Sequence, residues 1–206
     1  MLNRKYGEAS KNWGGVGEGF KPSVAGNTHP LGKVAVFGHS YVARLNESCP
    51  KVVDGRLLKL FWLGGATTFI IQFSHAFDRL VQYQPELTIL LIGGNDIKPE
   101  TQPRQLAAAI EQLAQRIEER TGGHCLILGI EKRSNPRGMS AEQFHKVRNA
   151  VNRNLRQKLV FARDRYHPME MSTEQLTYDG VHLNQVGTEH LFEVILQMVQ
   201  DYYKTH

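Results

Sequence analysis

A carboxylate and an imidazole stand three residues apart near the end of this chain, at Asp179 and His182. Imidazole titrates near neutral pH and can move a proton, and a carboxylate beside it can orient the ring and stabilise its charged form. The pair by itself is a weak signal, because the same spacing fits an ordinary polar turn before a helix. It indicates catalysis only if the fold brings a nucleophile to His182.

The candidate nucleophile is Ser40, in the segment Gly38-His39-Ser40. A serine hydroxyl is a poor nucleophile until a neighbouring imidazole takes its proton. In this arrangement Ser40 would attack, His182 would act as base and then as acid, and Asp179 would hold the ring. The alternative is that Ser40 caps a short helix, which is a common role for serine.

An attack on an acyl carbon also needs donors for the oxyanion that develops. The backbone N–H groups of Ser40 and Gly65 and the side-chain amide of Asn95 have the right chemistry. Gly64 could take the place of Gly65, and Asn95 could be an ordinary turn residue at a strand end. Asp96 is expected to cap the turn rather than to take part in catalysis.

These residues follow or precede apolar runs that alternate with amphipathic stretches. The apolar runs predict strands at 33–37, 57–63, 87–92 and 125–130, and a weaker one at 160–165. The amphipathic stretches predict helices at 41–45, after Thr67 or Thr68, at 103–120, at 140–159 and from about 185. The apolar side of the second helix is expected to contain Ile70, Phe73, Phe77, Leu80 and Val81, and that of the last one Val186, Leu191, Val194, Ile195, Met198 and Val199.

This alternation predicts a doubly wound α/β sandwich on a central parallel sheet of about five strands. Ligands bind such sheets outside the carboxyl ends of the strands. The turns at Gly38-His39-Ser40, Gly64-Gly65 and Gly94-Asn95-Asp96 should therefore lie at one edge of the sheet. The last helix can return Asp179 and His182 to that edge.

Composition excludes several other classes of protein. The chain has 206 residues, a net charge of +5 and dispersed basic residues, so a nucleic-acid partner is possible but not favoured. No stretch is long and apolar enough for a membrane span, no secretory signal is seen, and a cytoplasmic location is expected. The histidines show no metal-ligand spacing, and no metal or cofactor is predicted. Cys49 and Cys125 are expected to be small buried residues, and residues 1–31 a flexible segment ahead of one domain at 32–206.

The four blocks resemble the SGNH (GDSL-type) hydrolases. They occur in the family's order: Ser40, Gly65, Asn95, and the pair Asp179 and His182 within Asp179-Gly180-Val181-His182-Leu183-Asn184. The resemblance covers about residues 33–200. It implies a flavodoxin-like α/β/α fold and hydrolysis of esters of lipids, acylated sugars or other small acyl compounds, without metal or organic cofactor.

One position departs from that family, which usually has Asp where this chain has His39. A carboxylate there can support the active-site turn, whereas an imidazole changes the charge. Together with the block Asp179 to Asn184, this Gly-His-Ser variant is similar to SGNH domains of animal proteins, some of them associated with retrotransposons. The possible pocket residues are His39, Tyr41, Gly64 and Arg133. Arg133 and Arg137, on the loop after the strand at 125–130, could reach the pocket mouth and favour an acidic acyl substrate, although a polar loop is expected at that position in any case.

Two hypotheses follow. The first is a serine ester hydrolase of the carboxylesterase or acetylesterase type, which works through an acyl-enzyme on a small acylated substrate. The second is a catalytically weak module of the same fold that binds acylated ligands or a nucleoprotein partner. His39 and the positive net charge motivate the second hypothesis.

Overall fold

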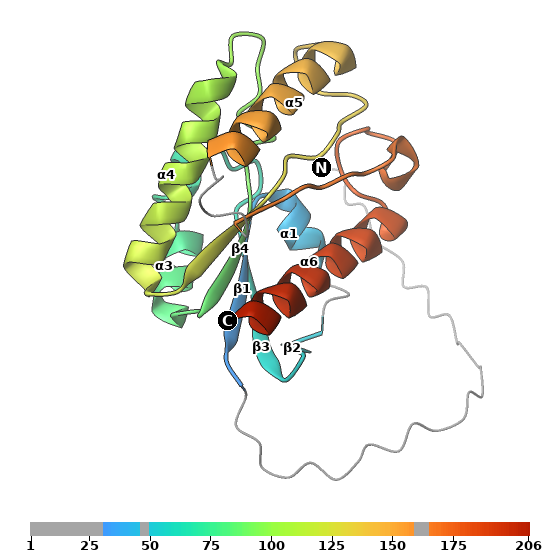
Figure 1. Cartoon of the computed structure of the whole chain (residues 1–206). Coiled ribbons are helices and arrows are strands. Elements are labelled where there is room, and N and C mark those ends of the chain that lie inside the picture. The colour runs from blue at the N-terminus through green and yellow to red at the C-terminus, as the bar shows by residue number, and fades with distance from the viewer. Residues whose placement is uncertain (1–30, 46–49, 159–164) are drawn as a thin grey trace, which may run out of the picture.

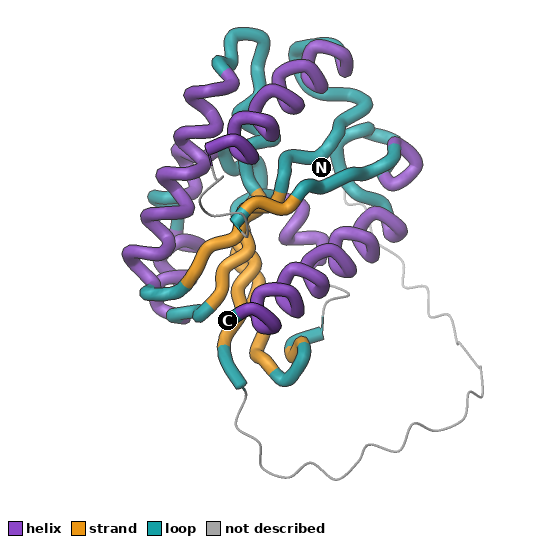
Figure 2. The backbone as a smooth tube through the Cα atoms, in the orientation of Figure 1, coloured by secondary structure: helices purple, strands orange, loops and turns teal. Residues whose placement is uncertain are grey.

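A computed structural model describes residues 31–45, 50–158 and 165–206, which form a sandwich around a six-stranded sheet (Figure 1; Figure 2). The sheet order is β2-β3-β1-β4-β5-β6. All neighbouring strands run parallel except β2 and β3. The strands are β1 (Lys33–Gly38), β2 (Val52–Val53), β3 (Arg56–Trp62), β4 (Leu87–Leu91), β5 (His124–Leu128) and β6 (Tyr166–His167).

Helices cover both faces of this sheet (Figure 1). One face carries α3 (His75–Tyr83), α4 (Pro103–Thr121) and α5 (Ala141–Lys158). The other face carries α1 (Ser40–Leu45) and α6 (Gln185–Thr205). Two short elements complete the described chain: α2 (Thr68–Ile71) and the 3₁₀ helix η2 (Thr173–Gln175).

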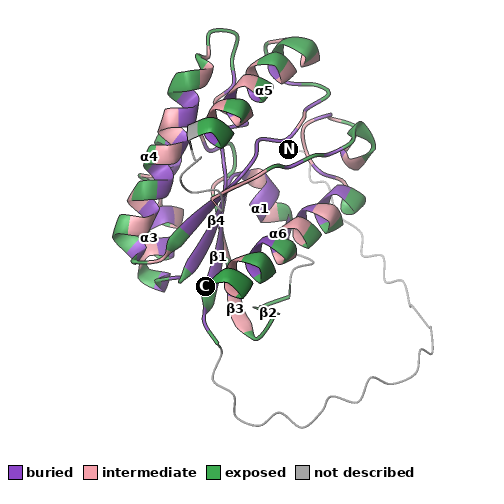
Figure 3. Cartoon of the chain, in the orientation of Figure 1, coloured by how far each residue is buried: buried purple, intermediate pink, exposed green. Residues whose placement is uncertain are grey.

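Side chains of β1 alternate between two hydrophobic clusters, as the two-residue period of a strand requires. Ala35 and Phe37 belong to the cluster under α3, α4 and α5, whereas Val34 and Val36 belong to the cluster under α1 and α6. All four are fully buried, and Figure 3 shows the central strands as the most buried part of the chain. Burial on both faces explains why the strands lack alternating polar residues.

The order of the parallel strands places a topological switch point at β1. From β1 the chain passes to β3 on one side and then to β4 on the other. Loops leaving the carboxyl ends of β1 and β4 diverge there, which opens the crevice where ligands bind in this architecture. Gly38 ends β1 so close to the Leu91 carbonyl that a Cβ atom would clash with it, so the close approach requires glycine.

The predicted fold class and the predicted strands at 33–37, 57–63, 87–92 and 125–130 are confirmed within a few residues. The short edge strand β2, which pairs antiparallel with β3, was not predicted. Of the weak strand expected at 160–165, residues 160–164 lie outside the described residues; β6 begins at Tyr166.

Helices at 103–120, at 140–159 and from 185 are confirmed, but the helix expected after Thr67 is two helices. The side chain of Ser74 accepts from the Phe77 N–H and starts α3 there. The break turns Ile70 and Phe73 outward, so the expectation that they face the core is wrong. Val186 is likewise exposed on the first turn of α6.

Thr88, in the middle of β4, tests what a buried hydroxyl without a hydrogen-bond partner costs the folded protein. Its side chain is fully buried, and within the described ranges its hydroxyl has no hydrogen-bond partner. A buried polar group without a partner costs about 1–3 kcal/mol. Thr88→Val keeps the shape and removes that hydroxyl, so we expect the free energy of unfolding in urea to rise by about 1 kcal/mol. A decrease of that size would mean that the hydroxyl is satisfied.

Candidate active site

Asp179 and His182 are in direct contact on the loop before α6. The Asp179 Oδ2 atom lies 2.7 Å from His182 Nδ1. The other carboxylate oxygen, Oδ1, accepts from the Thr177 hydroxyl at 2.7 Å and from the backbone N–H groups of Val181 and His182 at 2.9 Å each. The hydrogen bonds from His182, and then those from Thr177 and Val181, hold the pKa of Asp179 well below its usual range. Asp179 is therefore a carboxylate near neutral pH.

The loop that carries this pair is closed by backbone hydrogen bonds. The Thr177 N–H donates to the His182 carbonyl at 2.7 Å, and Gly180 sits at a positive φ of 67°. A side chain at Gly180 would clash with Ser134 and Asn135, whose backbone N–H groups both donate to the Gly180 carbonyl. Glycine is therefore required both for the conformation and for the contact with the loop after β5.

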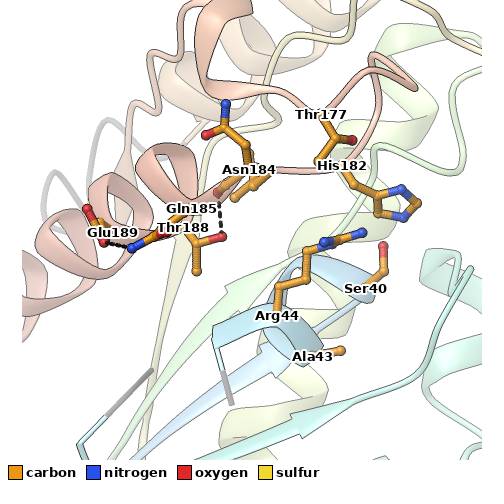
Figure 4. Close-up of a pocket in the computed structure, with 10 residues that line it drawn as sticks. Ser40, Ala43, Arg44, Thr177, His182, Asn184, Gln185, Thr188 and Glu189 are labelled. Carbon is orange, nitrogen blue, oxygen red and sulfur yellow. Dashed lines mark hydrogen bonds between the residues drawn. The ribbon is translucent and has the colours of Figure 1, made fainter. Parts of the chain in front are cut away.

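Ser40 lies at the start of α1 with its side chain directed toward the His182 ring (Figure 4). Ser40 is half-buried, and no hydrogen bond among the described residues uses its hydroxyl. The structure thus gives no support to the alternative in which Ser40 caps the helix. The fold brings together the serine and the imidazole that the sequence places 142 residues apart.

His39 supports the turn at Ser40. The backbone N–H of Tyr41 donates to His39 Nδ1 at 3.4 Å, which is a long contact at the position where an N-cap side chain acts. Burial, and then the positive charges of Arg133 and His182, lower the pKa of His39 to about 3. The imidazole is therefore neutral and adds no charge to this turn.

Tyr41 ties α1 to the loop of His182. Its hydroxyl donates to the Val181 carbonyl across 140 positions of sequence. Burial raises the pKa of Tyr41 above its usual value, so the hydroxyl stays protonated and remains a donor. This contact fixes the loop of Asp179 and His182 relative to the helix that begins with Ser40.

The turns after β3 and β4 are joined near Gly65 and Asn95. The Asn95 side-chain Nδ2 atom donates to the Ala66 carbonyl at 2.9 Å. Asp96 accepts from the Thr68 hydroxyl at 2.7 Å and from the Thr68 N–H at 3.0 Å, so its carboxylate binds the first turn of α2. The two turns that carry the candidate oxyanion donors are therefore linked to each other.

Two cavities meet at Ser40 and His182. One, of about 790 Å³, extends toward α6 and is drawn in Figure 4. The other, of about 690 Å³, extends over the ends of β3, β4 and β5. This second cavity is lined by the predicted oxyanion donors Gly65 and Asn95 and by Asp179, which is predicted to orient His182. Two predicted pocket residues, Gly64 and Arg133, also line it.

Two of the predicted pocket residues are placed differently. His39 and Tyr41 each expose only 1% of their surface, lie beneath Ser40, and line neither cavity. Arg44, which is not among the residues predicted from the sequence, extends along the first cavity beside Ser40 (Figure 4). Its spacing could have indicated it, because residues four apart on a helix share a face.

Glu131, just after β5, lies in a buried charged environment with Arg133 and Arg148. Burial raises the pKa of Glu131 from 4.5 to about 7, although the two arginines favour its ionised form. The folded state therefore holds this proton more tightly than the unfolded state, and the stability falls as the pH rises from about 4.5 to about 7.

Glu131→Gln should remove this dependence. We expect the variant to have a higher free energy of unfolding than the wild type. This difference should grow across that pH window to at most about 3 kcal/mol and stay constant above it. Urea denaturation of both proteins across the window measures it. Parallel pH profiles would contradict the assignment.

Among residues 31–45, 50–158 and 165–206 there is no group of three or more metal-binding side chains. In the same part of the chain, no helix is long and apolar enough to cross a membrane. Cys125 is buried, as predicted, while Cys49 and residues 1–30 lie outside the described residues.

Comparison with known families identifies the family of this chain. Residues 25–190 match the sequence profile of the GDSL-like Lipase/Acylhydrolase family, and the chain belongs to that family. Membership of this acylhydrolase family makes the chain a hydrolase of ester bonds. No match was found among curated proteins.

Solved structures of low sequence identity share the fold. A GDSL-like lipase from Bacteroides thetaiotaomicron has a TM-score of 0.62 at 15% identity, covering 82% of this chain and 88% of its own. A carbohydrate esterase family 3 protein from Talaromyces cellulolyticus has 0.60 at 13%, covering 85% and 100%. A carbohydrate acetylesterase from Sinorhizobium meliloti has 0.60 at 15%, covering 82% and 99%.

Proposed function

We propose that this protein is a serine esterase that cleaves small acylated substrates through an acyl-enzyme on Ser40. The observation that carries the proposal is the 2.7 Å contact between Asp179 and His182, with the His182 ring facing Ser40 (Figure 4). A carboxylate in contact with an imidazole whose ring faces a hydroxyl is the arrangement that activates serine. Three further hydrogen bonds from its own loop hold Asp179, so the ring has one preferred orientation.

The reaction would proceed in two halves. The Ser40 oxygen bonds to the ester carbonyl carbon while its proton passes to His182 Nε2, and the C=O pair of electrons moves onto oxygen. When the tetrahedral intermediate collapses, the bond to the alcohol oxygen breaks and His182 returns its proton to the leaving alcohol. Water then attacks the acyl-enzyme in the same way, releasing the acid and restoring the Ser40 hydroxyl.

The oxyanion would lie in the second cavity. The backbone N–H groups of Ser40 and Gly65 and one N–H of the Asn95 amide are the assigned donors, and Gly65 and Asn95 line that cavity. Preorganised donors stabilise the charge of the transition state more than the uncharged ester. The hydrogen bond from Asn95 to Ala66 and the contacts between Thr68 and Asp96 support this preorganisation.

The substrate class is an ester with a small acyl group. Two similar structures are named as a carbohydrate esterase and a carbohydrate acetylesterase, which makes acetylated sugars the first natural substrates to examine. For this chain that class is a proposal, because the likeness to these structures is one of fold.

Hydrolysis of p-nitrophenyl acetate, butyrate and octanoate by the full chain tests the proposal. We expect saturable turnover that is highest for the shorter acyl groups, with a burst of p-nitrophenol if deacylation is the slower half. A well-folded protein that hydrolyses none of these esters, nor acetylated sugars, would contradict it and favour the binding module.

A further inference from the structure

Arg133, on the loop after β5, contacts the candidate oxyanion donor from behind. It exposes 9% of its surface, and its Nη2 atom donates to Asn95 Oδ1 at 2.9 Å. Buried arginine is costly unless its donors are used, so this contact is a built feature of the site. The sequence alone predicts Arg133 only as a pocket residue.

The contact fixes which way the Asn95 amide points. A guanidinium can only donate, and the carbonyl of Ala66 can only accept. With Arg133 on Oδ1 and Ala66 on Nδ2, the amide has one consistent orientation. The Nδ2 group has two N–H bonds and makes one hydrogen bond within the described part of the chain, so the second N–H remains for an oxyanion.

Arg133 is itself held on three sides. Its guanidinium lies 5.5 Å from the centre of the Phe144 ring, and its carbonyl is 3.0 Å from His145 Nε2. A side chain at Gly94 would come within 2.7 Å of Nη2, so the guanidinium packs against bare backbone there. Rigid support of this kind is what a group needs in order to orient another group.

We propose that Arg133 is a positioning residue that holds the Asn95 amide toward the oxyanion and, through its charge, polarises that amide. The proposal rests on the proposed function, because it assigns Asn95 its role in the reaction. A cation on Oδ1 withdraws electron density from the amide and strengthens the remaining N–H as a donor. Arg133 would thus act in the transition state and contribute little to ground-state binding.

Arg133 also lines the second cavity, so a direct contact with substrate is the competing role. The two roles separate kinetically. A residue that contacts substrate in the ground state changes KM, whereas one that acts through Asn95 lowers kcat and kcat/KM together. Two residues that act through one contact also show non-additive effects when both are changed.

The test combines Arg133→Met, Arg133→Lys, Asn95→Ala and the double variant Arg133→Met with Asn95→Ala. Losing an oxyanion donor lowers turnover on the order of 10²–10³-fold, and we expect Arg133→Met to lose about 10–100-fold in kcat with KM nearly unchanged. Arg133→Lys, which keeps a cationic donor, should recover part of the loss. In the Asn95→Ala background, Arg133→Met should lower kcat less than about 3-fold.

Arg120→Met is the matched control, because Arg120 is an exposed arginine in the last turn of α4 that lines neither cavity. Its kcat should stay near that of the wild type. The proposal is overturned if Arg133→Met raises KM without lowering kcat, or if its full effect persists in the absence of the Asn95 amide.

A readout that does not depend on activity separates this proposal from the proposed function. In ¹⁵N-edited NMR spectra, the side-chain NH₂ signals of Asn95 are those that Asn95→Ala removes. We expect Arg133→Lys and Arg133→Met to shift these signals and Arg120→Met to leave them in place. Unmoved signals in a folded Arg133 variant would overturn the contact, whether or not the wild type hydrolyses esters.

Discussion

Ser40→Ala is expected to lower the turnover of short p-nitrophenyl esters on the order of 10⁴–10⁶-fold while leaving the fold intact. The loss is large because no other group can form the acyl-enzyme, and His182 then has no hydroxyl to deprotonate. The fold should survive because the Ser40 hydroxyl makes no hydrogen bond among the described residues. Initial rates and thermal denaturation of the purified variant measure both effects.

Ser140→Ala is the control, because it should lower the stability of the protein without changing its activity. Ser140 is exposed, and its hydroxyl accepts from the Gln143 N–H at the start of α5, away from both cavities. Losing such a cap costs about 1 kcal/mol of stability, and the activity should remain that of the wild type. If Ser40→Ala keeps wild-type activity, the assigned mechanism is wrong.

Asp179→Asn should lower kcat by about 10⁴-fold with a small effect on the fold. An amide can keep Oδ1 as the acceptor for Thr177, Val181 and His182, so the loop should hold its shape. Its Nδ2 group would then face His182 Nδ1 as a donor and favour the wrong tautomer of the ring. The imidazolium that forms during attack would also lose its counter-charge.

The matched control is Asp201→Asn, near the end of α6, where the carboxylate is 3.7 Å from Lys204 on the surface. Exposed pairs of this kind contribute little, and neither activity nor stability should change measurably. Asp179→Asn that retains more than about a tenth of the wild-type kcat would contradict the assigned orienting role.

The sequence was sufficient for the four central strands of the sheet and for the edge at which the candidate site lies. Short, nearly continuous apolar runs such as Leu87–Leu91 favour strands covered on both faces, and the turns that follow such strands meet at one edge. The break between α2 and α3 was missed because Ile70 and Phe73 fit a helical period while the Ser74 cap starts a new helix. Periodicity does not record which apolar residues remain exposed.

Local sequence patterns could not predict the contacts that support the candidate site. Arg133 reaches Asn95 across 38 positions, and Tyr41 reaches Val181 across 140. Such pairs depend on side-chain packing between loops, which no spacing rule supplies. The departure at His39 became interpretable only with burial and the contact from the Tyr41 N–H, which describe a neutral support of the turn rather than a charged pocket group.

Covalent labelling of the full chain with a fluorophosphonate, followed by tryptic digestion and mass spectrometry, tests the central claim most directly. Cleavage after Lys33 and Arg44 gives the peptide 34–44, in which Ser40 is the single serine. We expect one equivalent of label on that peptide at Ser40, and no labelling of the His182→Ala variant on the same time scale. Folded wild-type protein that stays unlabelled, or that carries its label at another residue, would contradict it.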